Sequence, residues 1–229
     1  MEAIVLAGGY GTRLRELVSD VPKPMAPVAG KPFLEILLGT LALKGFSHVV
    51  LSLGFMADKI SDHFGDQFAG MVIDYVVESH PLGTGGAVRL ALASCNQDHV
   101  FVFNGDTFLD LEVAEVEQLW QEQHHPIIVG RKVQDTKRYG SLLTAHACVT
   151  GFAEKGMSGP GLINAGCYVL ENSQLDEYPL QQPFSLEADF LTKTVQKIPV
   201  DVFVTEGLFI DIGIPEDYIR AQTLLAGAA

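Results

Sequence analysis

The stretch LAGGYGTRL (residues 6–14) follows the apolar run EAIVL and holds three glycines and an arginine. Such a glycine-rich turn after a buried strand lets backbone N–H groups approach a bound anion closely. Its spacing fits neither of two familiar nucleotide loops, because Leu14 stands where the dinucleotide fingerprint needs a third glycine. Arg13 stands where a Walker loop needs its second glycine. Taken alone, the stretch fits either a phosphate-binding turn or a plain strand-to-helix turn with a surface arginine.

Apolar runs typical of strands alternate with helical segments through the first half of the chain. The expected strands are residues 2–8, 48–54, 71–79, 99–106 and 126–133. The expected helices are residues 32–46, 58–64, 85–95 and 111–123. Continuous apolar strands separated by amphipathic helices predict an α/β, Rossmann-like three-layer fold with a mixed, mostly parallel sheet.

After residue 133 the pattern changes to shorter strand candidates, which predict added antiparallel strands in a small lobe. These strands are expected at residues 140–146, 149–155, 162–171 and 200–207. Helices are expected at about residues 185–197 and 215–226. We expect residues 1–229 to form a single domain of two halves, about 1–133 and about 134–229.

Composition limits the class of partner. The chain has 229 residues, of which 48 % are hydrophobic. Its net charge of −13 argues against nucleic acid as a general partner, because phosphate backbones bind basic surfaces. No apolar run approaches the roughly 18 residues of a membrane span. The three cysteines form no CxxC pair, so the cytoplasm is the expected compartment. A polyphosphate ligand would need the few cations concentrated at its site, with help from a divalent metal.

Lys23 lies between Pro22 and Pro24, and proline discourages helix in the residue before it. The segment VPKPMAPVAGKPFLE (21–35) is therefore expected to be a stiff extended arm that aims the lysine, or else a proline-rich surface loop. Arg13 and Lys23 together could hold a pyrophosphate.

Asp106 and Asp211 each follow an apolar strand candidate, in FVFNGD and LFIDIG. Ligands of open α/β sheets bind at the carboxyl ends of the strands, so distant loops would meet at one rim. Two carboxylates there suit Mg²⁺, which takes one or two carboxylates with phosphate oxygens and waters. The alternative for Asp106 is an ordinary Asn-Gly-Asp turn.

A second glycine loop, PLGTGGAVRLALA (81–93), opens a helix whose amides could contact a base edge or a phosphate. The alternative is a simple helix start capped by Thr84. Further along, polar residues at strand and helix ends could bind sugar hydroxyls and a phosphate, although singly they fit surface or capping roles. These are Glu154, Lys155, Asn164, Gly166 and Glu187.

Together these motifs resemble the sugar-1-phosphate nucleotidylyltransferases over essentially the full chain. The motifs LAGGYGTRL, VPKPMAPVAGKP, PLGTGGA, NGD, INAGCYVL, SLEADF and FIDIGIPEDY occur here in the order of that family. The resemblance is closest to the subgroup that guanylylates D-glycero-α-D-manno-heptose 1-phosphate. It implies a nucleotidyltransferase fold, nucleotide binding in the first half, sugar-phosphate binding in the second, and a role in cell-surface polysaccharide biosynthesis.

The resemblance also implies roles for individual residues. Arg13, Lys23, Asp106 and Asp211 would be catalytic, with the two aspartates as Mg²⁺ ligands. Nucleotide binding would involve Leu6, Ala7, Gly8, Gly9, Gly11, Thr12, Arg13, Lys23, Glu78, Gly83, Thr84, Asn104, Gly105 and Asp106. Sugar-phosphate binding would involve Gly140, Glu154, Lys155, Asn164, Gly166, Glu187 and Asp211. One departure is Gly156, which stands where relatives usually have proline after the Glu-Lys pair.

The expected reaction is attack of a sugar 1-phosphate on the α-phosphorus of a nucleoside triphosphate, GTP being favoured, with pyrophosphate leaving. A phosphate monoester is largely dianionic at pH 7, so no protein base is needed. Alternatives are a mannose- or other hexose-1-phosphate nucleotidylyltransferase using GTP, CTP or UTP, and a binding protein without turnover. A Rossmann oxidoreductase is disfavoured by the missing glycine. The sequence leaves a homodimer open.

Overall fold

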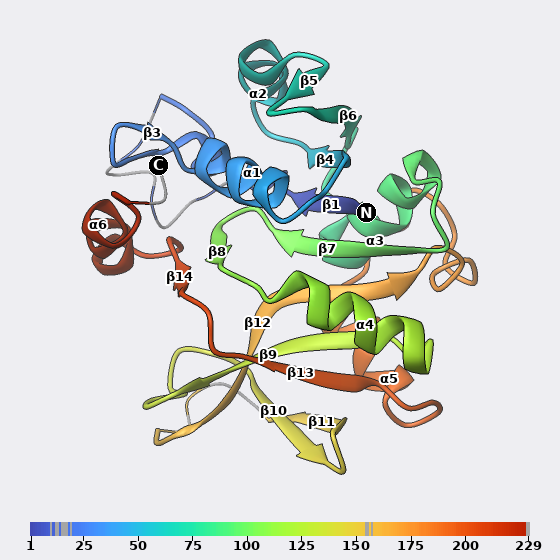
Figure 1. The fold of residues 1–229 in the computed structure, drawn as a ribbon. Helices are drawn as coiled ribbons and strands as arrows, with labels where there is room; N and C mark the ends of the chain where they lie inside the picture. The colour runs from blue at the N-terminus through green and yellow to red at the C-terminus, as the bar shows by residue number, and fades with distance from the viewer. Residues whose placement is uncertain are drawn as a thin grey trace.

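The computed structural model describes residues 1–9, 11, 14, 18, 20–153, 156 and 158–227. Its main feature is a ten-stranded sheet in the order β10-β11-β13-β9-β12-β7-β1-β4-β6-β5 (Figure 1). These strands are β1 (Glu2–Leu6), β4 (His48–Leu53), β5 (Gln67–Phe68), β6 (Met71–Val77), β7 (His99–Asn104), β9 (Ile127–Val133), β10 (Ser141–Ala145), β11 (Cys148–Ala153), β12 (Gly161–Glu171) and β13 (Asp201–Thr205). The strands β7, β1, β4 and β6 run parallel, and β12 joins antiparallel to β7. The predicted α/β fold with a largely parallel central sheet is confirmed.

Two short two-stranded sheets and six α-helices complete the described elements. The first sheet is the hairpin of β2 (Pro27–Val28) and β3 (Lys31–Pro32), and the second pairs β8 (Thr107–Leu109) with the sequence-distant β14 (Phe209–Asp211). The helices are α1 (Phe33–Leu43), α2 (Ala57–Phe64), α3 (Gly83–Ala91), α4 (Val113–Gln123), α5 (Thr192–Thr194) and α6 (Pro215–Leu224). Single turns of other helix types lie at η1 (Lys23–Met25), η2 (Leu92–Ser94) and η3 (Leu186–Leu191).

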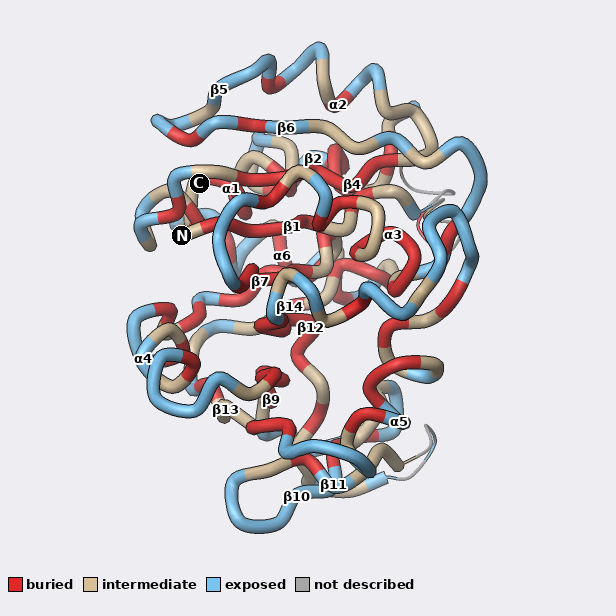
Figure 2. The backbone as a smooth tube through the Cα atoms, turned by 90° about the vertical axis from the view of Figure 1, so that its right-hand side faces the viewer, coloured by how far each residue is buried: buried red, intermediate tan, exposed pale blue. Residues whose placement is uncertain are grey.

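Helices cover both faces of the sheet, which explains why its central strands are apolar without alternation. On one face, α1, α2 and α4 pack on residues such as Val5, Leu51 and Phe103. On the other, α3 and η3 pack on residues such as Ile4 and Val102. Burial is concentrated along β1, β7 and β12 (Figure 2), whose neighbouring side chains are removed from water on both sides.

The antiparallel strands of the second half extend the same sheet. β12 pairs with both β7 and β9, and β9 pairs in parallel with β13. β10 and β11 form a hairpin that touches β12 and β13 through single residue pairs. The expected small antiparallel lobe is therefore anchored to the central sheet through β12.

Two local predictions differ from the structure, and one pair of strands was not predicted. The expected arm at residues 21–35 contains the 3-10 turn η1 and the β2–β3 hairpin. Pro24 fits that turn because the first turn of a helix needs no N–H from it. The expected helix at 185–197 is the π-turn η3 followed by the short α5. Strands β8 and β14 were not expected as a pair, although both contain apolar residues.

Candidate active site

The carboxyl ends of β1, β4 and β7 open into a cavity of about 620 Å³. Its lining combines residues from five separate segments of the chain, as expected for the edge of a parallel sheet. Eleven residues expected to bind nucleotide line it: Leu6, Ala7, Gly8, Gly9, Lys23, Glu78, Gly83, Thr84, Asn104, Gly105 and Asp106. Sequence-distant motifs thus meet in one cavity, of the size of a small-molecule site.

Some expected residues lie elsewhere or cannot be placed. Thr12 and Arg13, and the pair Glu154 and Lys155, lie outside the described residues. Gly11 is not part of the cavity lining. It adopts φ +59°, and a Cβ there would lie 2.7 Å from the Cβ of Lys23. The glycine therefore lets the loop pass close beside the lysine.

The lysine and the first aspartate are in direct contact. Lys23 Nζ lies 2.5 Å from Asp106 Oδ2, and 9 % of the lysine side chain is exposed. The 3-10 turn η1 places Lys23 at the cavity, with Pro24 and Met25 buried behind it. An ammonium held against a carboxylate at a cavity wall can be exchanged for another cation or moved to an anionic ligand.

The two aspartates lie on neighbouring strand ends. In the antiparallel β8–β14 pair, Asp211 is opposite Thr107, the residue after Asp106. The N–H of Ile212 donates to the carbonyl oxygen of Asp106 at 3.0 Å. A Cβ built on Gly213 would lie 2.7 Å from Asp211 Oδ1 and 3.3 Å from Lys23 Nζ. Both carboxylates and the ammonium therefore belong to one cluster.

These aspartates supply the oxygen donors that a magnesium ion prefers, since Mg²⁺ binds proteins through one or two carboxylates. Among the residues that the structure describes, no group of three or more His, Cys, Asp or Glu side chains could hold a metal. Substrate oxygens would have to complete the coordination of a cation at Asp106 and Asp211.

Glu78 lines the cavity after β6, which two strands separate from β7, the strand that leads to Asp106. Its Oε2 accepts the N–H of Leu82 at 3.0 Å, and its Oε1 lies 3.5 Å from where a Cβ on Gly8 would be. Burial raises the pKa of the Glu78 carboxyl, while the Leu82 N–H and His80 act in the opposite direction. A partly buried carboxylate there is an acceptor for hydrogen-bond donors of a ligand.

Thr84 does not cap α3, so that alternative is wrong. The helix begins at Gly83, where φ is +69° and a Cβ would lie 2.6 Å from the carbonyl oxygen of Phe184. The Thr84 hydroxyl donates to Glu187 Oε2 at 2.9 Å and accepts the N–H of Leu186 at 2.9 Å. Thr84 therefore connects the cavity to η3.

A hydrogen-bonded network joins the residues expected to bind sugar. The Tyr168 hydroxyl donates to Glu187 Oε1 and accepts from Asn164 Nδ2, both at 2.8 Å. The Asn164 N–H donates to the carbonyl oxygen of Gly140 at 3.3 Å. Burial of Tyr168 raises the pKa of its phenol well above the usual value. The network continues through Glu187 to Thr84. The residues expected to bind the sugar phosphate therefore adjoin those expected to bind the nucleotide.

Several cavity residues were not anticipated from the sequence. Pro24, Ser52, Gly54, Phe55, Ser79, His80, Pro81 and Ala87 also line the cavity. Phe55, His80 and Pro81 come just after expected strands, and Ser52, Gly54 and Ser79 lie among the last residues of those strands, which is the signal that could have found these six. Tyr168 was missed because its single hydroxyl lies within the apolar run of β12.

The comparisons with known proteins agree with this geometry. A model of the nucleotidyl transferase family matches residues 2–227. The chain belongs to the nucleotidyl transferase family. D-glycero-alpha-D-manno-heptose 1-phosphate guanylyltransferase of Aneurinibacillus thermoaerophilus is 38 % identical over 223 residues, covering 97 % of each chain. The protein of that name from Campylobacter jejuni is 37 % identical over 219 residues, covering 95 % of this chain and 97 % of its own.

Among solved structures of this family, HddC from Yersinia pseudotuberculosis, crystallised with GMP-PN, superposes with a TM-score of 0.87. It is 38 % identical, and the alignment covers 98 % of this chain and 99 % of that one. The resemblance stated from the motifs is thereby confirmed. No helix in the described part of the chain is long and apolar enough to cross a membrane.

Proposed function

We propose that this nucleotidyl transferase moves GMP from GTP to D-glycero-α-D-manno-heptose 1-phosphate, giving GDP-heptose and pyrophosphate. The observation that carries the proposal is the cluster of Lys23, Asp106 and Asp211, of which Lys23 and Asp106 line the cavity. Relatives that match nearly the whole chain carry the corresponding guanylyltransferase name, which supports this choice of donor and acceptor.

The roles of the residues follow from the charge that the reaction develops. The glycine turn at Gly8, Gly9 and Gly11, with Arg13, would surround the triphosphate. Lys23 would leave Asp106 and bind the phosphates as a point charge. Asp106 and Asp211 would hold Mg²⁺, which, when bound, neutralises charge on the α-phosphate and the leaving pyrophosphate. Electrostatic stabilisation of this kind is typically the largest contribution to catalysis.

Alignment of the acceptor supplies the rest of the rate enhancement. The sugar 1-phosphate is its own nucleophile, because its second pKa of about 6 leaves it dianionic at pH 7. Orientation of two reactants contributes on the order of 7–11 kcal/mol in favourable systems. Gly140, Glu154, Lys155, Asn164, Gly166 and Glu187 would position the sugar phosphate in line with the α-phosphorus.

Glu78 supports guanine as the base. Guanine presents two adjacent donors, the N1–H and the N2 amine, which a carboxylate accepts together. On the same Watson–Crick edge, cytosine, adenine and uracil each present at most one donor beside an acceptor. Glu78 lines the cavity after β6, and β1 and β4 lie in the sheet between β6 and β7, the strand that leads to Asp106. A charged acceptor left opposite a carbonyl oxygen of a wrong base would be strongly disfavoured.

The proposal is tested by measuring pyrophosphate release with each of four triphosphates against several hexose and heptose 1-phosphates, with and without Mg²⁺. We expect the highest kcat/KM with GTP and the heptose 1-phosphate, and no turnover without Mg²⁺. A higher kcat/KM with mannose 1-phosphate would select the alternative acceptor. Preference for UTP or CTP would contradict the role given to Glu78.

A further inference from the structure

The glycine loop at the start of α3 is held by residues 182–187, which we call the 182–187 segment. The Phe184 N–H donates to the carbonyl oxygen of Leu82 at 3.0 Å. The Phe184 carbonyl oxygen accepts the N–H groups of Gly85 and Gly86, at 3.0 Å and 3.3 Å. Three main-chain hydrogen bonds therefore attach this loop to a residue in the second half of the chain.

These bonds decide which part of the loop a ligand can use. The first N–H groups of a helix lack partners within the helix, which makes them ready donors for a base edge or an anion. Those of Gly85 and Gly86 are already bonded to Phe184. Gly83 and Thr84 line the 620 Å³ cavity, so they form the part of the loop that would meet the nucleotide.

Packing against the 182–187 segment requires two of the glycines of this loop. A Cβ built on Gly85 would overlap the Phe184 ring, and one built on Gly86 would lie 2.8 Å from the carbonyl oxygen of Gln182. Side chains at these two positions would push the loop and the segment apart. Both glycines are therefore needed for this contact, whatever a ligand requires.

Phe184 is itself held in place by its neighbours. It is 8 % exposed and belongs to the hydrophobic cluster that includes residues of α3 and η3. Its ring stacks on that of Tyr178, with 4.1 Å between the centroids and 16° between the planes. The Tyr178 hydroxyl donates to the carbonyl oxygen of Asp189 at 3.1 Å, and the Tyr178 carbonyl oxygen accepts from Arg89 Nε at 3.2 Å. The position of the glycine loop therefore depends on a ring that α3 and η3 both support.

The 182–187 segment also carries Glu187, which is expected to bind the acceptor. Glu187 Oε2 accepts the Thr84 hydroxyl at 2.9 Å, and the Leu186 N–H donates to the same hydroxyl at 2.9 Å. Phe184 and Glu187 are thus bonded to one loop from one short segment. Displacement of either residue would strain the contacts of the other.

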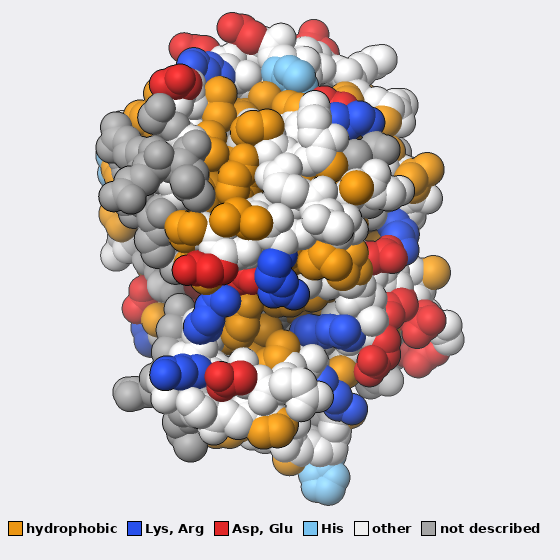
Figure 3. Space-filling model, turned by 90° about the vertical axis from the view of Figure 1, so that its left-hand side faces the viewer, with side chains coloured by type: hydrophobic (Ala, Val, Ile, Leu, Met, Phe, Trp, Pro, Cys, Tyr) orange, Lys and Arg blue, Asp and Glu red, His pale blue; other side chains and the backbone are white. Residues whose placement is uncertain are grey.

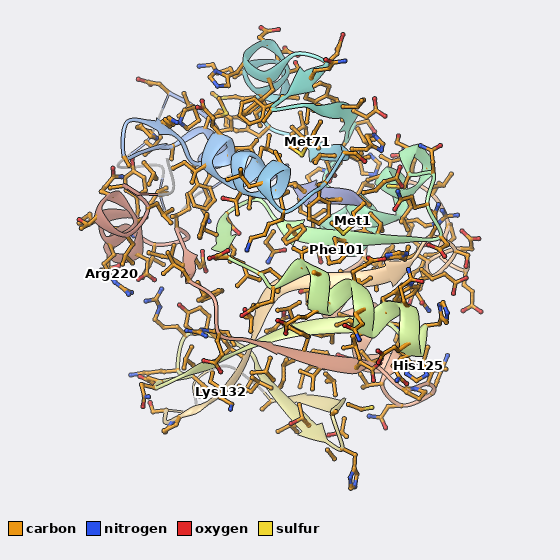
Figure 4. All side chains as sticks on the ribbon, viewed as in Figure 1. Met1, Met71, Phe101, His125, Lys132 and Arg220 are labelled. Atoms are coloured by element: carbon orange, nitrogen blue, oxygen red, sulfur yellow. The ribbon has the colours of Figure 1, made fainter. Side chains whose placement is uncertain are left out.

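Glu187 reaches the acceptor side of the site through the hydrogen-bonded network described above. That network ends one residue after Tyr139, which lines a second cavity of about 400 Å³ together with Asp211. Arg220 on α6 lies above this cavity and Lys132 near the end of β9 lies below it (Figure 4). Lys and Arg side chains surround a hollow on this face of the molecule (Figure 3). Such a concentration of positive charge favours a negatively charged acceptor.

We propose that Phe184 is a positioning residue through which the nucleotide and the sugar 1-phosphate strengthen each other's binding. The inference rests on the proposed function, since it needs one ligand at the glycine loop and the other at Glu187. A ligand that fixes the glycine loop also fixes the 182–187 segment, so the first ligand to bind bears the entropic cost of ordering both. By linkage, each ligand must raise the affinity for the other by the same factor.

The test is calorimetric titration of the full-length protein, with Mg²⁺ present, by a GTP analogue in which a methylene group joins the α- and β-phosphorus atoms. The titration is repeated on protein saturated with D-glycero-α-D-manno-heptose 1-phosphate. We expect the wild-type protein to bind the analogue at least about fivefold more tightly with the acceptor present, the lower end of typical coupling between sites. Phe184→Leu should reduce this ratio of affinities to less than about twofold, because Gly85 loses its contact with the ring.

Phe190→Leu is the matched control. Phe190 lies in the same cluster, is 5 % exposed, and has its ring edge-on to Tyr178 at 6.1 Å. Urea unfolding should show a loss of stability in both leucine variants, but Phe190→Leu should keep the wild-type ratio of affinities. A second pair of variants tests the other link to the loop. Thr84→Val lacks the hydroxyl bonded to Glu187 and should lower the ratio, whereas Thr84→Ser should keep it.

Three results would overturn the inference. The first is equal affinity of the wild-type protein for the analogue with and without the acceptor. The second is an undiminished ratio in Phe184→Leu or, should that variant not fold, in Thr84→Val. The third is an equal loss of the ratio in Phe190→Leu.

The proposed function is judged separately, by pyrophosphate release. If another triphosphate and another acceptor turn over best, the methylene analogue of that triphosphate and that acceptor replace the pair above. A different substrate pair therefore corrects the proposed function, and the coupling is still measured.

Discussion

The ammonium of Lys23 lies 2.5 Å from Asp106 Oδ2, so the lysine occupies a carboxylate oxygen that the proposed metal would use. This contact predicts competition between the two cations. Lys23→Ala should bind Mn²⁺, in the absence of nucleotide, several-fold more tightly than the wild-type protein. Turnover should fall by about 10²–10³-fold, because a positive charge on the phosphates is lost.

The matched control for this prediction is Lys31→Ala. Lys31 is an exposed lysine whose nearest carboxylate, on Glu35, lies 3.9 Å away. It should change neither Mn²⁺ affinity nor turnover. Weaker Mn²⁺ binding in Lys23→Ala would mean that the lysine supports the metal site instead of competing for it.

Glu78→Gln should change base selectivity. The amide keeps an acceptor for the N–H of Leu82 but no longer offers two negative oxygens to the donors of guanine. We expect kcat/KM for GTP to fall by about 10²-fold, and that for UTP to fall less or to rise. The measurement is initial rate of pyrophosphate release for both triphosphates. An unchanged ratio would remove Glu78 from base recognition.

The same substitution should alter how stability depends on pH. Burial raises the pKa of Glu78 above 4.5, so the folded state binds this proton more tightly than the unfolded chain does. The contribution of Glu78 to stability is therefore most favourable below pH 4.5 and is lost as the pH rises through the raised pKa. Urea unfolding from pH 4.5 to 7.5 should show Glu78→Gln gaining stability relative to wild type. A constant difference would contradict the assigned shift.

Gly9 and Gly11 should respond differently to alanine. Gly11→Ala places a Cβ 2.7 Å from that of Lys23 at φ +59°, which should cost about 1–2 kcal/mol of unfolding free energy. A Cβ on Gly9 meets nothing within 4 Å among the described residues, so Gly9→Ala should leave stability within about 0.5 kcal/mol. Gly9→Ala should still raise the KM for GTP if the triphosphate approaches the backbone of residue 9. Equal stabilities would show that the Gly11 contact is absent in solution.

Much of the central fold could be predicted from the sequence, because strands covered on both faces read as apolar runs. β1, β4 and β7 lie within a few residues of their expected ranges. The segment Leu186–Leu191 is the π-turn η3 and not a regular helix, although the Ser185 side chain caps it and accepts from the N–H of Ala188 as at the start of an α-helix. Such local geometry depends on tertiary contacts and leaves no periodic pattern.

Individual residues of the candidate site could be predicted from the sequence, but the strand pairing and hydrogen bonds that join them could not. Because both aspartates follow apolar runs, the sequence predicted that Asp106 and Asp211 lie near each other, and the structure brings them together through the separate β8–β14 pair. The β8–β14 pairing that brings them together is short and joins segments about a hundred residues apart, so no local signal shows it. Tyr168 was missed for a related reason, since its role depends on partners from other elements.

Tyr168→Phe should weaken the network between the two halves of the site. The buried hydroxyl bonds to Asn164 and Glu187, and its loss leaves both with one partner fewer. We expect a loss of about 1–2 kcal/mol in unfolding free energy and a higher KM for the sugar 1-phosphate. Tyr218→Phe is the control, because its hydroxyl is exposed, donates to the carbonyl oxygen of Pro27, and should cost at most about 0.5 kcal/mol when removed. Equal losses of unfolding free energy in Tyr168→Phe and Tyr218→Phe would contradict the role of Tyr168 as a link between Asn164 and Glu187.

The central claim is that Asp106 and Asp211 hold one divalent cation together at the triphosphate. The most direct measurement is the binding of Mn²⁺, followed by electron paramagnetic resonance, to the protein saturated with a non-hydrolysable GTP analogue. Asp106→Asn and Asp211→Asn should each lower the affinity for Mn²⁺ by at least about tenfold. Asp110→Asn, which removes a carboxylate paired with Lys44, should not. Wild-type Mn²⁺ affinity in both Asp106→Asn and Asp211→Asn would contradict the account.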